Sequence, residues 1–192
     1  MSSTELIKQL RDETGVSIMQ CKKALEEAGG DIEKAKVTLR KVSAQVAAKK
    51  SDRELGSGAV QAYIHAGNSV AGVVVLACET DFVAKNEEFV KLAYDIAMHV
   101  AATAPEFVSR KQVTDDATAA ARAVFEEEAA DKPEEMRAKI VEGKIDSFLK
   151  EKVLLEQAFI KNPDSTVQGL IDEASQKFGE RIEVAQMQRF AV

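Results

Sequence analysis

The residue types that carry chemistry in enzymes are sparse in this chain and are not arranged for a reaction. The two histidines, His65 and His99, have no metal-ligand partner at helical spacing, and the two cysteines, Cys21 and Cys78, form no CxxC pair. His99 falls on the apolar stripe of a predicted helix, which favours a core histidine. Neither a GxxxxGKS/T loop nor a GxGxxG turn is present. We therefore expect no enzyme, no cofactor and no direct nucleotide binding.

A different kind of chemistry, binding to another protein, is indicated by residues 78–89, CETDFVAKNEEF. They follow an apolar run typical of a buried strand, and they place Phe82 beside the carboxylate of Asp81 at the turn where that strand ends. A rigid aromatic side chain is well suited to fill a pocket in a partner. The alternative is structural: Thr80 caps the turn while Phe82 and Val83 pack under it. Taken alone, the residue types favour this structural alternative.

The composition is typical of a soluble globular protein, with 45% apolar and 30% charged residues. No stretch approaches the roughly 20 apolar residues that a membrane helix needs, and the N-terminus is unlike a signal peptide. The expected location is therefore cytoplasmic, with no membrane partner. The formal net charge is -6, and acidic residues dominate beyond residue 52. Since tryptophan is absent too, we expect no nucleic-acid partner.

Residues 1–40 predict three short helices, because capping residues and glycines divide the segment. The predicted helix starts are Ser2 with Glu5, Ser17 with Gln20, and Asp31; the predicted helix ends are Gly15 and Gly29-Gly30. Residues 41–56 form a basic connector, for which a helical and a flexible conformation both stay open. We predict a first domain over residues 1–52, made of the three-helix module and this connector, and a second over residues 53–192.

Beyond the connector, the pattern predicts strands covered by helices. Residues 57–66 alternate as a half-buried strand, with Val60, Ala62 and Ile64 on one face and polar residues on the other. Gly67-Asn68 predicts a hairpin turn into the strand Val70–Cys78. A helix is predicted over 86–102 with Asn86 as its cap, and another over 167–178. Between them, residues 114–160 are predicted to be helical with breaks at Pro133 and Gly143, and the expected core residues there are Met136, Ile140, Phe148 and Leu154. A third strand is predicted over 181–190. The fold class is α+β, with a small antiparallel three-stranded sheet covered by helices.

Several stretches, taken in order, resemble one family. Residues 10–40, LRDETGVSIMQCKKALEEAGGDIEKAKVTLR, resemble the N-terminal module of bacterial elongation factor Ts, and residues 72–89, GVVVLACETDFVAKNEEF, resemble its core signature. The stretches that agree further are YIH at 63–65, DIAMHVAATAPEFV at 95–108, KPEEMRAKIVEGKIDSF at 132–148 and LLEQAFIKNPDSTV at 154–167. The resemblance covers essentially the whole chain.

This resemblance implies a guanine-nucleotide exchange factor for the translational GTPase elongation factor Tu, built from a ubiquitin-associated-like three-helix module and an α+β core. It implies that the TDFV turn enters beside the magnesium and phosphate site of the partner, and that the N-terminal module docks on the GTPase domain. The matching residues are Thr80, Asp81, Phe82 and Val83 in the turn, and Arg11, Met19 and Lys22 in the module.

Two features depart from the family pattern. Relatives often have Met-Met-Asp before the cysteine, where this chain has Ile18-Met19-Gln20. Many relatives are also longer, with a duplicated core and an inserted coiled-coil hairpin, so the chain resembles the short type with a single core. Short-type relatives can pair two cores, which leaves a homodimer open.

Two other classes of function stay open at this point. One is a non-enzymatic adaptor that uses the three-helix module to bind a ubiquitin-like or RNA partner. The other is an acid–base enzyme around His65, for which the sequence indicates no substrate. Of the three hypotheses, exchange-factor activity alone gives the aromatic residue of the TDFV turn a role.

Overall fold

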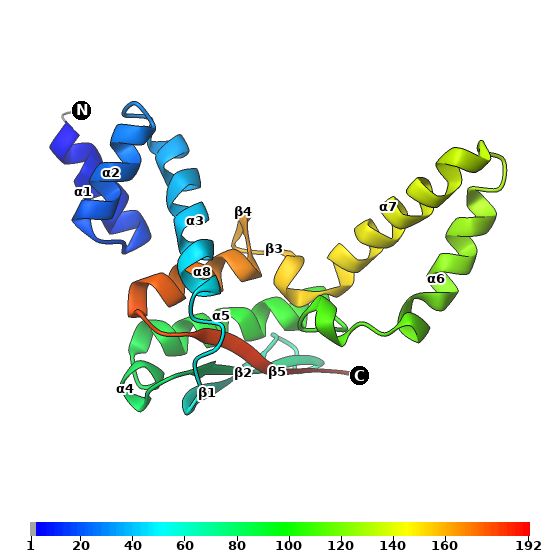
Figure 1. The fold of residues 1–192 in the computed structure, drawn as a ribbon. Coiled ribbons are helices and arrows are strands. Elements are labelled where there is room, and N and C mark those ends of the chain that lie inside the picture. The colour runs from blue at the N-terminus through cyan, green and yellow to red at the C-terminus, as the bar shows by residue number, and fades with distance from the viewer. Residues whose placement is uncertain (1–2) are drawn as a thin grey trace. The chain divides into compact units, whose positions relative to one another are not determined.

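The computed structural model describes residues 3–192 and has the predicted α+β architecture (Figure 1). The helices are α1 (Ser3–Thr14), α2 (Ile18–Glu27), α3 (Ile32–Ala48), α4 (Asp81–Ala84), α5 (Glu87–Thr103), α6 (Asp115–Glu128), α7 (Glu134–Lys152) and α8 (Val167–Phe178). The strands β1 (Ser57–Ile64), β2 (Val70–Cys78) and β5 (Ile182–Ala191) form one sheet with β2 in the centre, and β3 (Ala158–Phe159) pairs with β4 (Asn162–Thr166). Within the described residues, no helix is both long and apolar enough to cross a membrane.

Close contacts gather the chain into two compact units. The first contains residues up to Gln61 together with Val75–Tyr94 and Gln168–Ala185. The second contains Ala62–Val74, Asp95–Val167 and the residues from Gln186 onward. The predicted domains 1–52 and 53–192 stay a prediction.

In the first unit, α1 and α2 end, and α2 and α3 begin, where the sequence predicts. The side chains of Ser17 and Asp31 each accept a hydrogen bond from the backbone N–H three residues later, at 3.4 and 3.1 Å. Gly15 ends α1 with a φ of 68°, which a residue with a side chain rarely adopts. The proposed cap Ser2 lies outside the described residues. Together, α1, α2 and α3 enclose a small apolar core of Leu10, Val16, Cys21, Ala24, Leu25, Ala35 and Leu39.

The connector over 41–56 is helical in its first part, because α3 continues to Ala48 before a short turn. Three side chains attach α3 and this turn to α8: Arg40 pairs with Glu173, Ser43 bonds to Gln176, and Lys50 donates to the carbonyl oxygen of Ser175 at 2.7 Å. Lys50 is buried, and its burial lowers the pKa of the ammonium group. The three-helix module is therefore held on α8 by polar contacts.

The strand β1 alternates as predicted, but its apolar face is the exposed one. Val60 and Ile64 are 64% and 63% exposed, whereas Gln61 and Tyr63 are half-buried. The period of two assigns residues to opposite faces but does not say which face the helices cover. On this edge strand, they cover the face that carries the polar residues.

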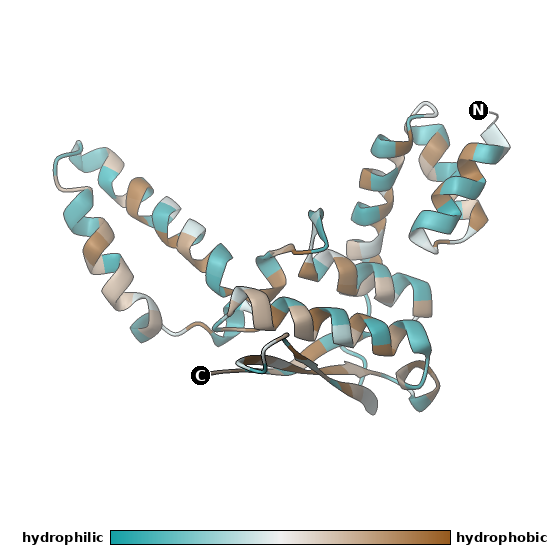
Figure 2. Cartoon of the chain, turned by 180° about the vertical axis from the view of Figure 1, so that it is seen from behind, coloured by the Kyte–Doolittle hydropathy of each residue, from teal (hydrophilic) through white to brown (hydrophobic). Residues whose placement is uncertain are grey.

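In the second unit, α6 and α7 pack as an antiparallel hairpin around Ala129, Val141, Ile145, Leu149 and Val153. Hydrophilic and hydrophobic stretches alternate along both helices (Figure 2). The predicted break at Gly143 is wrong, because α7 runs through it: one glycine costs only about 1 kcal/mol among strong helix formers. The predicted burial of Met136 is also wrong, since its side chain lies in the first turn of α7 and is 54% exposed.

The short sheet of β3 and β4 was not predicted, and it lies next to His99. The Nδ1 atom of His99 accepts from the backbone N–H of Ile160 at 3.3 Å, so the proton is on Nε2, which donates to Gln157 at 2.8 Å. Burial lowers the pKa of this imidazole. His99 is thus a hydrogen-bonded core histidine, as predicted.

Gly72 provides a test of the packing between β2 and α5. A Cβ atom at Gly72 would lie 2.2 Å from the carbonyl oxygen of Ala97 and 2.9 Å from the backbone nitrogen of Ala101. Because these are backbone atoms of a helix, Gly72→Ala is expected to lower the free energy of unfolding by about 2–3 kcal/mol. The matched control is Gly143→Ala, where nothing lies within 4 Å of the added Cβ; it is expected to raise that free energy by about 0.5–1 kcal/mol. Equal effects of the two substitutions in urea unfolding would contradict the packing described.

Candidate functional site

The TDFV residues, 80–83, lie where β2 ends and α4 begins. Thr80 is the N-cap of α4: its backbone is extended, and its hydroxyl accepts a hydrogen bond from the backbone N–H of Val83 at 3.4 Å. Asp81 occupies the first turn, where a carboxylate is favourable beside the positive end of a helix. The predicted turn is therefore a capped helical turn that follows a buried strand almost directly.

The side chains of α4 point in two directions. Val83 and Ala84 are buried and fix the turn on the core, whereas Phe82 is 81% exposed. The structural alternative, in which both Phe82 and Val83 pack under the turn, is therefore right for Val83 and wrong for Phe82. The ring of Phe82 leaves its apolar surface available to another molecule.

Asp81 is charged and faces solvent beside Phe82. Its carboxylate forms an ion pair with Lys85, with 2.7 Å between Oδ2 and Nζ, and the hydrogen bond from Lys85 lowers the pKa of Asp81. Both side chains are mostly exposed, so the pair contributes little to stability. A partner can therefore exchange this ion pair for its own contacts at small cost.

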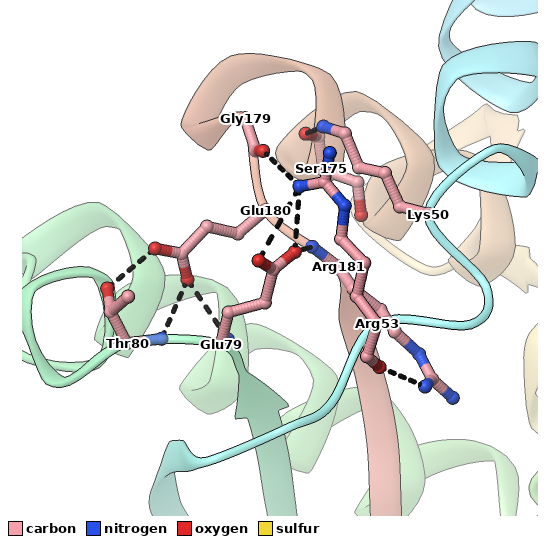
Figure 3. A network of polar contacts seen from close by, with 8 residues as sticks. All are labelled: Lys50, Arg53, Glu79, Thr80, Ser175, Gly179, Glu180 and Arg181. Carbon is pink, nitrogen blue, oxygen red and sulfur yellow. Dashed lines mark hydrogen bonds and ion pairs between the residues drawn. The ribbon is translucent and has the colours of Figure 1, made fainter.

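The base of α4 is held by Glu180, which no sequence motif identified. Glu180 lies in the turn between α8 and β5 (Figure 3). Its Oε2 atom accepts hydrogen bonds from the backbone N–H groups of Glu79 and Thr80, both at 3.0 Å. Its Oε1 atom accepts from the hydroxyl of Thr80 at 2.6 Å. One carboxylate thus receives three hydrogen bonds from the two residues that precede α4.

Glu79 makes the reciprocal contact. Its carboxylate accepts from the backbone N–H of Arg181 at 2.5 Å and from the guanidinium of Arg53 at 3.2 Å. The hydrogen bond from the Arg181 backbone, and then that from Arg53, lower the pKa of Glu79. Arg53 also donates to the carbonyl oxygen of Gly179 at 3.3 Å. The end of β2, the start of β5 and the connector after α3 are therefore bonded to one another (Figure 3).

The second group of predicted residues lies on the N-terminal helices. Met19 is 77% exposed on α2, on the side away from the buried Cys21, and Ile18, the first residue of α2, is 55% exposed. Lys22 is also exposed, one turn from Met19, and its Nζ atom is 3.8 Å from a carboxylate oxygen of Glu26. Arg11 is exposed in the last turn of α1. The module thus exposes two apolar side chains on α2, with the cation Lys22 one turn from Met19.

The groups considered for other chemistry have structural environments. His65 is exposed, and its Nδ1 atom lies 3.0 Å from the hydroxyl of Tyr63. Cys21 and Cys78 are both buried, and burial raises the pKa of each thiol. Among residues 3–192, no group of three or more His, Cys, Asp or Glu side chains is arranged to hold a metal ion. Both thiols are therefore small, buried core residues.

The chain is similar to known proteins over almost its whole length. A family model described as Elongation factor TS matches residues 17–192. An elongation factor Ts from Desulforamulus reducens is 47% identical over 98% of this chain and 88% of its own length. Those from Thermosipho melanesiensis and Herpetosiphon aurantiacus are 45% and 44% identical, over 100% and 99% of this chain and 99% and 97% of their own lengths.

Two phenylalanines in neighbouring helices test the assignment of Phe82 to the surface. Phe82→Ala is expected to change the free energy of unfolding by less than about 0.5 kcal/mol, because the ring is 81% exposed. Phe89→Ala is expected to lower it by about 3–5 kcal/mol, because Phe89 is fully buried against Phe178. Thermal and urea unfolding of both variants measure the difference. A large loss of stability in Phe82→Ala would show that the ring supports the fold.

Proposed function

The chain belongs to the elongation factor Ts family, and on this premise we propose that it is a guanine-nucleotide exchange factor that promotes release of GDP from elongation factor Tu. The single observation that carries the proposal is the exposed Phe82 on a capped turn whose remaining apolar residues are buried. In this proposal, the protein disturbs the magnesium and phosphate site of its partner and needs no nucleotide or cofactor of its own.

Exchange of this kind needs only a difference in affinity. A GTPase holds GDP through Mg²⁺ and through backbone N–H groups around the phosphates. A protein that binds the nucleotide-free partner more tightly than the GDP-bound partner weakens GDP binding by the same factor. Incoming GTP then displaces the protein for the same reason. The cycle involves no covalent step, so the protein acts by binding and not as an enzyme.

Phe82 is proposed as the side chain that enters the partner. It has only two rotatable side-chain bonds, and it sits on a turn that Thr80 caps and Val83 anchors. Burial of its ring contributes about 2–3 kcal/mol, which is enough to shift packed side chains near the nucleotide. Asp81 brings a carboxylate to the same place, where it repels phosphate or competes for a backbone donor. Thr80 and Val83 hold these two side chains in position.

The N-terminal module is proposed to supply affinity. The exposed Met19, with Ile18 beside it, offers apolar surface for the GTPase domain, and the exposed cations Arg11 and Lys22 of the same module are proposed to contact it as well. Interfaces combine such an apolar centre with a polar rim. Ile18 stands where relatives often have methionine, and it keeps the surface apolar. Binding by the module and disturbance by the turn are therefore separable in this proposal.

Two other parts of the hypothesis stay predictions. A homodimer is supported by the exposed Val60 and Ile64 of β1, which a second copy would bury. The adaptor alternative, with a ubiquitin-like or RNA partner on the three-helix module, assigns no role to Phe82. The acidic composition and the absence of tryptophan also disfavour RNA as a partner.

Release of a fluorescent GDP analogue, mant-GDP, from elongation factor Tu tests the proposed function. The wild-type protein is expected to accelerate release, and Phe82→Ala to reduce the maximal stimulated rate by roughly 10- to 100-fold, since 1.4 kcal/mol corresponds to tenfold. The matched control is Phe190→Ala, which removes another exposed phenylalanine and is expected to retain the wild-type rate. If the wild-type protein leaves the rate of mant-GDP release from elongation factor Tu at its spontaneous value, the exchange function is refuted.

Met19→Ala tests the role of the module in the same assay. Because Met19 is proposed to contribute affinity alone, the concentration for half-maximal stimulation is expected to rise by about 3- to 10-fold at an unchanged maximal rate. The control is Val37→Ala, an exposed apolar residue of the same module on α3, which is expected to behave as wild type. A lowered maximal rate with unchanged half-maximal concentration would contradict this assignment.

A further inference from the structure

We propose that Glu180 is a positioning residue for exchange: its carboxylate fixes the direction in which α4 presents Phe82. This inference rests on the proposed exchange function and adds to it a residue about one hundred positions away in the sequence. The residue touches neither the partner nor the nucleotide in this proposal. It acts through the backbone of Glu79 and Thr80, which it binds directly.

The need for such a residue follows from the length of α4. A single helical turn is unfavourable by itself, because fixing several backbone dihedral angles yields very few hydrogen bonds. The four residues Asp81–Ala84 therefore depend on contacts outside the turn. Val83 and Ala84 provide one attachment by burial at the end of α4. The start of α4, which sets the direction of Phe82, has to be fixed separately.

Glu180 provides that second attachment with an unusual concentration of bonds. Two backbone N–H groups and one hydroxyl, all from Glu79 and Thr80, converge on its two carboxylate oxygens at 2.6 to 3.0 Å. Hydrogen bonds to a charged acceptor are stronger than those between neutral groups. The Thr80 hydroxyl donates to Glu180 and accepts from Val83, so the same atom joins the carboxylate to the first turn of α4.

Glu180 is itself fixed, which a positioning residue requires. It follows Gly179, whose φ of 74° ends α8 and turns the chain toward β5. The next residue, Arg181, donates its backbone N–H to the carboxylate of Glu79. Its guanidinium donates to the carbonyl oxygen of Arg53 at 2.5 Å. The contacts on either side of Glu180 thus hold it from the strand, the helix end and the connector (Figure 3).

Substitutions at Glu180 separate positioning from folding. Glu180→Ala removes all three acceptor contacts, and Glu180→Asp retracts the carboxylate by one methylene group. Glu180→Gln keeps the length: its amide oxygen accepts from both backbone N–H groups, and its amide nitrogen donates to the Thr80 hydroxyl. The matched control is Glu183→Ala, which removes a glutamate of β5 that pairs with Arg181 and does not contact Glu79 or Thr80.

The full-length variants are compared in mant-GDP release from elongation factor Tu over a range of concentrations. Glu180→Ala and Glu180→Asp are expected to lower the maximal rate by roughly 10-fold, as misplacement of an interacting group does. The half-maximal concentration is expected to change less than about 3-fold, because the N-terminal module is intact. Glu180→Gln is expected to restore most of the rate, and Glu183→Ala to match wild type. Amide hydrogen exchange at residues 79 and 80 is expected to quicken in Glu180→Ala alone among the Ala variants.

A double substitution gives the decisive outcome. If Glu180 acts through Phe82, the double variant Glu180→Ala/Phe82→Ala stimulates GDP release from elongation factor Tu as strongly as Phe82→Ala alone. The positioning role would be overturned, while the exchange function stands, if the rate losses of the two single variants multiply in the double variant. Equal rate losses in Glu180→Ala and Glu183→Ala would overturn it too. A wild-type protein that does not stimulate release would instead refute the exchange function itself. If Glu180→Ala does not fold, the comparison of Glu180→Asp with Glu180→Gln decides the question in the same way.

Discussion

The carboxylate of Glu180 binds the backbone immediately before α4, and the geometry of the exposed turn depends on this contact. Without it, the two N–H groups at the end of β2 have no protein acceptor among the contacts described, and a four-residue helix has little stability of its own. The reciprocal bond, from the backbone N–H of Arg181 to the side-chain carboxylate of Glu79, joins the residue after β2 to the residue before β5. Together with the burial of Val83 and Ala84, these contacts fix the backbone that carries the solvent-facing Phe82.

The same region also holds the N-terminal module. Arg40 attaches the middle of α3 to α8, Lys50 attaches the turn after α3 to α8, and α8 leads through Gly179 directly into Glu180. Both groups of proposed partner-binding residues therefore belong to one compact unit and are connected through α8. This arrangement suits an exchange factor, because binding by the module promotes exchange only if the Phe82 turn keeps a fixed position relative to the module.

Local signals in the sequence predicted most elements, and they drew attention to the turn that exposes Phe82. Thr80 was predictable as a cap and Phe82 as an unusual aromatic at a strand end, because both depend on neighbours in sequence. The face of β1 was not predictable, since periodicity does not reveal where the helices lie. The helix break predicted at Gly143 was wrong because the low helix propensity of glycine is a weak effect, which the packing of α7 outweighs. Glu180 could not be found at all: its partners are about one hundred residues away, and only the folded backbone brings them together.

In the proposed function, the Phe82 turn makes the protein prefer nucleotide-free elongation factor Tu to the GDP-bound form. Equilibrium titration of both forms measures this preference as a ratio of two dissociation constants. We expect a large ratio for the wild-type protein, equal to the factor by which the protein weakens GDP binding, and a ratio near one for Phe82→Ala. Equal affinity of the wild-type protein for the two forms, or an undiminished ratio in Phe82→Ala, would contradict it.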